Sequence, residues 1–143
     1  MEKILYVKRL NKDKRINIKM EKEEKTTLKP DYIVGFSDGE GTFNLVKYPD
    51  GRIRPQFLVF NTNREILEKI KKTLELNCPI FEVVRIFDVI KRRKKCYRLQ
   101  ARSREDIDKV VAFFDKNLPI VKEKEYAIFR AAYDGWSFGK KGL

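Results

Sequence analysis

The sequence predicts an α+β fold in which a curved, four-stranded antiparallel sheet carries its helices on one face. Two stretches of the chain alternate apolar and polar residues on either side of a turn, which is the pattern of a β-hairpin. Helix-forming segments precede each stretch and follow the second, so the element order is αββαββα. A chain of 143 residues has room for one domain of this kind.

The chain begins with a segment of mixed character. Residues 1–28 contain short apolar runs around a turn-forming stretch, and we expect them to form an accessory basic extension of the domain at 29–143. Pro30 suits the first turn of a helix, and Asp31 suits the positive end of its dipole. A short helix is therefore predicted from Pro30 to Gly39.

The first hairpin is predicted over residues 42–59. Tyr48-Pro49-Asp50-Gly51 has proline and glycine where a type I turn prefers them, and the segments on either side alternate. Because successive strand residues point to opposite faces, one face is expected to pack in the core with Phe43, Leu45, Phe57 and Val59. The opposite face is basic and amide-bearing, with Asn44, Val46, Tyr48, Arg52, Arg54 and Gln56.

A second helix and hairpin follow. Apolar residues from Ile66 to Leu74 have the spacing of an amphipathic helix that starts after Asn63 and ends near residues 77–79. Strands are predicted at 80–90 and 96–102. In the second strand the core face is Tyr97, Leu99 and Ala101, and the opposite face is Arg98, Gln100 and Arg102. The register of the first strand stays open, because its inner face is either Ile80, Glu82, Val84 and Ile86 or Phe81, Val83, Arg85 and Phe87.

The last part of the chain is predicted to be helical. Ser103 and Asp106 form a capping box for a helix over 103–117, which has an apolar stripe. Pro119 permits another helix to begin. That helix continues through Tyr126 and Phe129 towards a basic tail after Gly135.

The charge balance points to a polyanionic partner. The chain has 33 basic minus 21 acidic residues, a net charge of +12, and a small folded chain accepts such self-repulsion more readily beside nucleic acid. No apolar run approaches the roughly 18 residues of a spanning helix, and the apolar stretch at the start is too short for a signal peptide. We therefore expect a protein without a membrane anchor that stays inside the cell with the genome.

The residue types exclude several kinds of site. The chain has no histidine, which excludes a histidine general base and Ser-His-Asp catalysis. Two cysteines without histidine cannot complete an ordinary zinc site, so Cys78 and Cys96 are expected to be packing residues. Any catalysis must then use carboxylates, lysine and a metal other than zinc.

One segment resembles a known signature. Residues 33–41, Ile-Val-Gly-Phe-Ser-Asp-Gly-Glu-Gly, are similar to the nine-residue motif of the LAGLIDADG homing endonucleases, and the αββαββα order is similar to that family's fold. One clear copy is present, and single-motif members of the family are homodimers. The resemblance implies a double-strand DNA endonuclease that cuts a long, nearly palindromic site and is encoded within an intron or intein. It also implies that Mg²⁺ or Mn²⁺ supports cleavage and that Ca²⁺ binds without supporting it.

The two glycines of the motif suggest how a dimer forms. Gly35 and Gly39 share one face of the predicted helix, where a missing Cβ lets another backbone come close. The same helix of a second copy fits there, and the residues expected at this interface are Gly35, Phe36, Asp38 and Gly39. The alternative is ordinary packing of the helix within its own domain.

The acidic residues of the motif suggest a metal site. Asp38 and Glu40 lie at the negative end of the helix dipole, where a carboxylate is unfavourable unless a cation is near. In the family pattern the second acidic position is the metal ligand, here Glu40, helped by the backbone carbonyl of Gly39. Many members have aspartate there, so the longer Glu40 alters the coordination geometry. The alternative is that both acids are solvated surface residues.

Two further positions carry over from the family pattern, and a third is a candidate for the role of one of them. Asn61 matches a polar residue that holds active-site water, and its alternative role is a helix cap. Lys122 matches an active-site lysine that offsets charge on the phosphorus, and its alternative is a solvated side chain. Arg64 is a weaker candidate for the same electrostatic role.

The basic sheet face suits the major groove of DNA. A strand of about eight residues spans roughly 26 Å, comparable with seven or eight base pairs, so one subunit can read one half-site. Arginine pairs with guanine and amide side chains pair with adenine, while the second hairpin tip would hold phosphates. The predicted DNA contacts are Asn44, Val46, Tyr48, Arg52, Arg54, Gln56, Arg64, Lys91, Arg93, Arg98, Gln100 and Arg102.

Other functions stay open. A protein of this family can also act as an RNA-splicing maturase or as a DNA-binding regulator that does not cut, although the presence of Glu40 favours cleavage. A protein of anionic membranes, or a structural protein, would show an apolar stripe opposite a basic one on a helix. The basic residues here lie largely on predicted strands and their turns.

Overall fold

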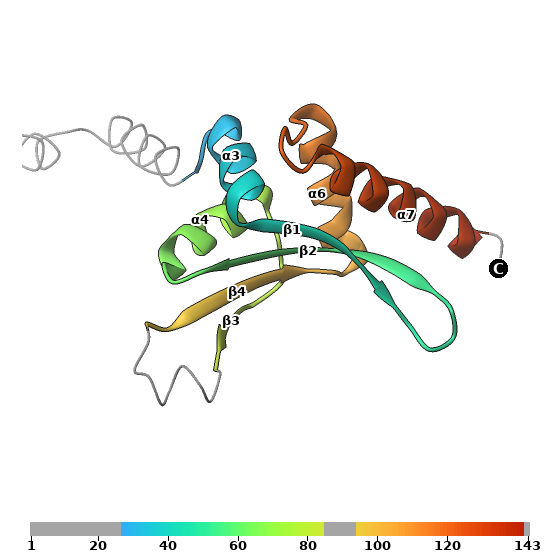
Figure 1. Cartoon of the computed structure of the whole chain (residues 1–143), viewed down its shortest axis with the longest axis horizontal. Helices are drawn as coiled ribbons and strands as arrows, with labels where there is room; N and C mark the ends of the chain where they lie inside the picture. The colour runs from blue at the N-terminus through green and yellow to red at the C-terminus, as the bar shows by residue number, and fades with distance from the viewer. Residues whose placement is uncertain (1–26, 85–93, 142–143) are drawn as a thin grey trace, which may run out of the picture.

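The described residues form one antiparallel sheet with its helices on one face (Figure 1). The computed structural model describes residues 27–84 and 94–141, with the side chains of the last helix as far as Trp136. The elements are α3 (Pro30–Glu40), β1 (Gly41–Lys47), β2 (Ile53–Asn61), α4 (Arg64–Leu74), β3 (Ile80–Val83), β4 (Cys96–Ala101), α6 (Arg104–Lys116) and α7 (Glu123–Lys141). The α+β class and the αββαββα order are confirmed, with α7 as an additional helix, and no described element covers the other face of the sheet.

The turn of the first hairpin forms where the sequence predicts it. The N–H group of Gly51 donates to the carbonyl of Tyr48 at 2.9 Å, and Gly51 has φ of 89°. Glycine adopts this left-handed conformation without a steric cost, and a type I turn followed by such a residue matches the twist of the two strands. Pro49 and Asp50 occupy the central positions of this turn.

Strand pairing decides the register that the sequence left open. The strand order is β1-β2-β4-β3, and Ile80 pairs with Leu99, whose side chain is fully buried under the helices. Ile80 and Glu82 therefore point towards the helices, and Phe81 points to the opposite face. The remainder of the predicted strand, from Arg85 to Ile90, lies outside the described residues, as does the hairpin tip at 91–93.

An aromatic cluster forms the centre of the core. Phe43 lies with its ring centroid 4.9–5.3 Å from the rings of Phe57, Phe114, Tyr126 and Phe129, and all five side chains are buried. The prediction that Leu45 joins this core is wrong, because Leu45 is 38% exposed. It lines an open groove of about 810 Å³ between the hairpin and α7, beyond the point where the helices pack closely on the sheet.

Two helix boundaries differ from the prediction. α4 ends at Leu74, because Glu75 adopts a left-handed conformation with φ of 58° and its N–H group bonds the carbonyls of Lys71 and Lys72. α7 begins at Glu123 rather than near Pro119. The backbone N–H groups of Ile120 and Lys122 bond the Asp38 side chain, which holds the segment before α7 in an irregular conformation.

The predicted capping box is only half formed. The Ser103 side chain accepts from the N–H group of Asp106 at 3.2 Å, as expected for a helix cap. The Asp106 carboxylate is buried and accepts from the N–H group of Asn77 at 2.8 Å, instead of bonding back to Ser103. Asp106 therefore joins the start of α6 to the segment that leads into β3.

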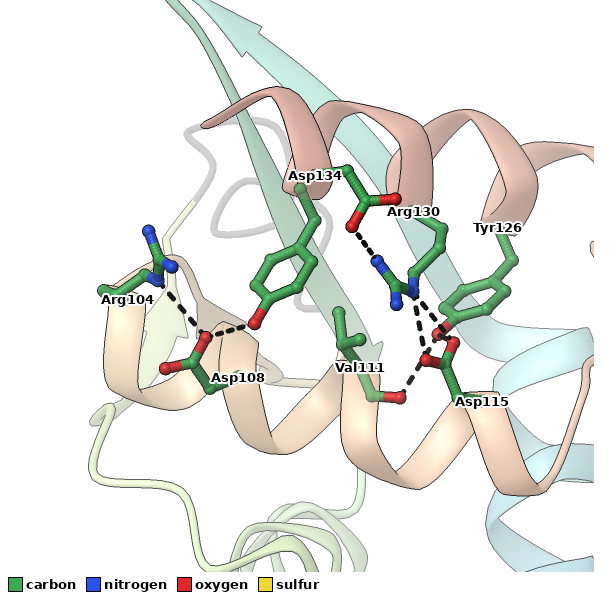
Figure 2. A network of polar contacts seen from close by, with 8 residues as sticks. Arg104, Asp108, Val111, Asp115, Tyr126, Arg130 and Asp134 are labelled. Atoms are coloured by element: carbon green, nitrogen blue, oxygen red, sulfur yellow. Dashed lines mark hydrogen bonds and ion pairs between the residues drawn. The ribbon is translucent and has the colours of Figure 1, made fainter. Parts of the chain in front are cut away.

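Polar contacts tie α7 to α6 (Figure 2). Asp115 on α6 accepts from the hydroxyl of Tyr126 at 2.6 Å and from Nε of Arg130 at 3.0 and 3.1 Å. Burial and the adjacent Asp115 carboxylate raise the pKa of Tyr126, so its hydroxyl remains a donor at physiological pH. The carbonyl of Lys122 accepts from the N–H group of Tyr126, so these contacts also locate the start of α7.

Gly41→Ala is expected to destabilise the fold. A Cβ at Gly41 would lie 2.8 Å from the carbonyl oxygen of Ser37, a backbone atom that cannot move without disturbing the last turn of α3. The expected loss in free energy of unfolding is about 1–3 kcal/mol, measured by urea denaturation. Gly135→Ala is the matched control, because nothing lies within 4 Å of its added Cβ and alanine favours a helix by about 0.5–1 kcal/mol. Equal effects of the two substitutions would contradict this account.

Candidate active site and nucleic-acid interface

Glu40 stands at the end of α3, where the helix passes into the edge strand β1. Ile33 and Ser37 anchor the helix and are fully buried, whereas Glu40 is exposed. The last turn of α3 contains no basic residue, and a carboxylate at this end opposes the helix dipole. Positive charge at this place must therefore come from elsewhere.

Lys122 brings a positive charge to the same helix end. Its Nζ donates to the carbonyl oxygen of Ser37 at 3.3 Å and also to that of Gly41. Ser37 lies in the last turn of α3 and Gly41 is the residue that caps it, so the ammonium group of Lys122 is at the helix end where a cation is favoured. Two of the residues predicted to share one site, Glu40 and Lys122, are thus brought to the same end of α3.

Asp38 is stabilised in a different way from Glu40. Its carboxylate accepts from the backbone N–H groups of Ile120 at 3.0 Å and of Lys122 at 3.2 Å. These donors compensate the charge of Asp38 within the protomer. The sequence suggested a cation for both acids, and this suggestion now rests on Glu40 alone. Asp38 instead holds the segment that carries Lys122 against α3.

Asn61 ends β2 beside the same junction. Val59 pairs with Gly41, so Asn61, two residues further along β2, lies next to the place where α3 ends. Its Oδ1 accepts from the N–H group of Asn63 at 2.8 Å. The cap of α4 is Asn63, whose side chain accepts from Ile66, so the alternative role of helix cap belongs to Asn63.

The oxygen atoms at this end of α3 suit a hard divalent cation. Mg²⁺ is usually bound by one or two carboxylates, keeps several waters and takes further oxygens from substrate phosphates. The exposed carboxylate of Glu40 and the backbone carbonyl of Gly39 are donors of this kind. Within 27–84 and 94–141, no three acidic or cysteine side chains gather to form a complete metal site.

One face of α3 meets no described part of the chain. A Cβ added to Gly35 or Gly39 would have no atom of residues 27–84 or 94–141 within 4 Å, so the described residues give no support to the alternative that these glycines serve packing inside the protomer. Tyr32 and Phe36 lie on one flank of this face with their ring centroids 6.1 Å apart. The segment held by Asp38 exposes three apolar side chains next to α3, which are Leu118 (58%), Ile120 (80%) and Val121 (77%).

The uncovered face of the sheet carries most of the predicted nucleic-acid contacts. Asn44 pairs with Gln56 across β1 and β2, and Nε2 of Gln100 donates to Oε1 of Gln56 at 2.9 Å. The guanidinium of Arg98 lies 5.4 Å from the ring centroid of Phe81. Sequence reasoning missed the apolar middle of this face, where Leu58 and Phe60 lie. The unbroken apolar run from Phe57 to Phe60 was the available signal.

The remaining basic candidates lie near the ends of strands and helices. Arg52 pairs with Asp50 in the turn, and Arg64 bonds Glu68 at 3.2 Å. Arg102 is exposed just after β4, and the guanidinium of Arg54 lies 5.2 Å from the ring centroid of Tyr48, the first residue of the hairpin turn. Lys91 and Arg93 fall outside the described residues. In the part of the chain that the structure describes, no helix is long and apolar enough to cross a membrane.

Comparisons with known proteins agree with this architecture. A family model described as LAGLIDADG endonuclease matches residues 33–133. The chain is similar to the homing endonuclease I-TnaI, with 25% identity and a TM-score of 0.63 over 79% of this chain and 76% of that one. It is also similar to the archaeal intron-encoded homing endonuclease I-Vdi141I, solved in complex with DNA, with 25% identity and a TM-score of 0.63 over 80% of this chain and 72% of that one.

A further structure shows the same fold in a longer chain. I-CpaMI, a LAGLIDADG meganuclease bound to uncleaved DNA, matches at 20% identity and a TM-score of 0.66. The match covers 80% of this chain and 38% of I-CpaMI. No curated protein sequence matches this chain.

Proposed function

Because the chain belongs to the LAGLIDADG endonuclease family, we propose that it is a site-specific nuclease that cuts double-stranded DNA as a homodimer with a divalent metal. The observation that carries this proposal is the arrangement of α3. Its glycine face meets none of the described residues of its own protomer, and the same helix ends in the exposed Glu40, at the helix end that Lys122 also contacts. One helix thus supplies both a surface for a second copy and a carboxylate for a metal.

The lengths of related chains support the homodimer. This chain spans 76% of I-TnaI and 72% of I-Vdi141I but 38% of I-CpaMI. I-CpaMI has room for two units of this fold, and a second copy of the unit described here would complete the same architecture. The apolar side chains of Leu118, Ile120 and Val121, exposed beside α3, are the kind of surface that a stable interface buries.

DNA binding is proposed for the uncovered face of the sheet. I-Vdi141I was solved in complex with DNA, and this chain shares its fold at 25% identity. The face combines arginines with amide side chains, which are the groups that read guanine and adenine in the major groove. A two-fold dimer presents this face twice, so we expect the preferred site to be long and nearly palindromic.

The residues at the end of α3 have separate roles in the proposed reaction. A divalent ion supplies Lewis-acid stabilisation of the charge that develops on the scissile phosphate. Glu40 holds this ion, with the carbonyl of Gly39. Lys122 adds positive charge at the same place. Asn61 uses its oxygen for the turn at Asn63, and its amide N–H groups remain to orient water.

Cutting of randomised duplex DNA tests the proposal. The wild-type protein is incubated with the duplex library and Mg²⁺, and the ends of the cut molecules are sequenced. We expect one long, nearly palindromic sequence to be enriched, Mn²⁺ to replace Mg²⁺, EDTA to abolish cutting, and Ca²⁺ to permit binding alone. A protein that selects a site but cuts nothing with either metal is a regulator. One that prefers folded RNA is a maturase. Each of these two results contradicts the proposal.

A further inference from the structure

A continuous series of aromatic rings and guanidinium groups joins the first hairpin to the helices. Arg54 on β2 lies over two rings, with its guanidinium carbon 5.2 Å from the centroid of Tyr48 and 5.7 Å from that of Trp136 on α7. Arg104 at the start of α6 lies 4.8 Å from the same Trp136 ring. We term Tyr48, Arg54, Trp136 and Arg104 the cation–π ladder.

The ladder forms where the sheet is narrow. β2 pairs with β4 only from Phe57 to Asn61. Among the described residues, Arg54 therefore has a neighbouring strand, β1, on one side only. Arg54 starts on the uncovered face of the sheet, opposite Val46. Because the other edge of β2 is open there, the arginine side chain can extend past it to the indole ring of α7.

The position of Arg54 is not one that folding stability alone favours. Its Nε is buried without an acceptor among the described residues, and no carboxylate of those residues pairs with it. A buried donor without an acceptor is destabilising, and the two ring contacts offset part of this cost. Two rings close to one guanidinium group limit where that group can lie, so the position of Arg54 is restricted before any ligand binds.

Trp136 is itself held in place by the helices. It is half-buried and packs against the hydrophobic core. Arg104, which also lies near this ring, donates from Nε to Asp108 at 3.2 Å (Figure 2). Packing and polar contacts between α6 and α7 therefore hold the indole ring of Trp136. The ring in turn limits where Arg54 lies.

We infer that Trp136 is a positioning residue for DNA specificity, which holds Arg54 so that this arginine reads one base pair in the outer part of the half-site. The inference rests on the proposed DNA-binding function. Arg54 lies towards the hairpin turn, at the opposite end of β1 and β2 from Glu40, which places its base pair away from the cleavage position. A pre-oriented arginine can pair with guanine through two hydrogen bonds, whereas a mobile one meets phosphates as readily as bases.

Binding-site selection on randomised duplex DNA tests the inference. Wild type is compared with Trp136→Ala, Arg54→Ala and the double variant, and a thermal melt of each protein establishes that it is folded. Both single variants should lose preference at the same base pair, by about tenfold, which is within the range of one arginine–guanine contact. The double variant should lose no more than Arg54→Ala, because the two residues act through one contact. Trp136→Phe keeps a ring and should restore part of the preference.

Ile128→Ala is the matched control. Ile128 lies on the same helix and lines the same groove, but it is not part of the ladder, so its removal should leave every base preference unchanged. If Trp136→Ala weakens binding to all sequences equally, Trp136 stabilises the fold or helps to bind phosphates, and the inference is wrong. It is also wrong if Arg54→Ala alters no position. If the wild-type protein itself selects no sequence, the proposed function is wrong. If wild type selects a site and only the Trp136 result fails, the proposed function stands and the inference about Trp136 is wrong.

Discussion

Glu40→Gln is expected to abolish DNA cleavage and to leave sequence-specific binding intact. Glutamine keeps the length of the side chain at the exposed end of α3 but removes the charge that holds a divalent cation. Metal ions contribute several kcal/mol to the stability of such transition states, so the cleavage rate should fall roughly a hundredfold or more. Single-turnover cleavage of the selected site measures this rate.

Glu65→Gln is the matched control for this experiment. Glu65 is an exposed glutamate in the first turn of α4 that pairs with Lys69 at 3.6 Å, so its removal should leave cleavage at the wild-type rate. Binding is measured by fluorescence anisotropy without metal, where Glu40→Gln should bind at least as tightly as wild type because it lacks one negative charge near the phosphates. Wild-type cleavage by Glu40→Gln would show that Glu40 is not the metal ligand.

Gly35→Leu is expected to dissociate the homodimer without unfolding the protomer. The added side chain meets no described residue of the same chain, and leucine favours a helix over glycine, so the protomer should be at least as stable as wild type. In a dimer that packs through α3, the substitution enters a two-fold interface twice. Overpacking costs about 1–3 kcal/mol for each copy, so the dissociation constant should rise roughly thirtyfold or more.

Sedimentation equilibrium of Gly35→Leu against wild type measures this constant. Ala112→Leu is the matched control, because it adds the same side chain at an exposed position of α6 and should leave the dimer unchanged. Double-strand cleavage by Gly35→Leu should fall with the fraction of dimer at the concentration used. An unchanged dimer in Gly35→Leu would show that the glycine face of α3 is not the interface, and a monomeric wild type bound to its DNA would exclude the homodimer altogether.

Local patterns in the sequence were sufficient to predict the elements of the fold. The turn at Tyr48–Gly51 and the cap at Ser103 depend on groups within a few positions of one another, and both form as expected. Periodicity likewise placed Phe43, Phe57 and Leu99 in the core. The boundaries were less accurate, because α4 ends at a left-handed glutamate, Glu75, that no composition rule marks as a helix end.

The sequence predicted the part of the candidate site that lies within the single helix α3. The spacing of Gly35 and Gly39 placed them on a common face, and no residue that the structure describes covers this face. The position of Glu40 at the helix end also followed from the motif. The role of Asp38 did not, because its partners are the N–H groups of Ile120 and Lys122, more than eighty residues further along the chain.

The sequence by itself thus determined the family, the order of the elements and the residues on each face of α3, because these depend on neighbours within a few positions. Tertiary structure decided the rest. The pairing of Ile80 with Leu99 settled the register of β3, and the path of α7 left Leu45 exposed and brought Trp136 to Arg54. A periodic pattern specifies which face of an element is apolar, but only the packing of helices over the sheet specifies which residue covers it.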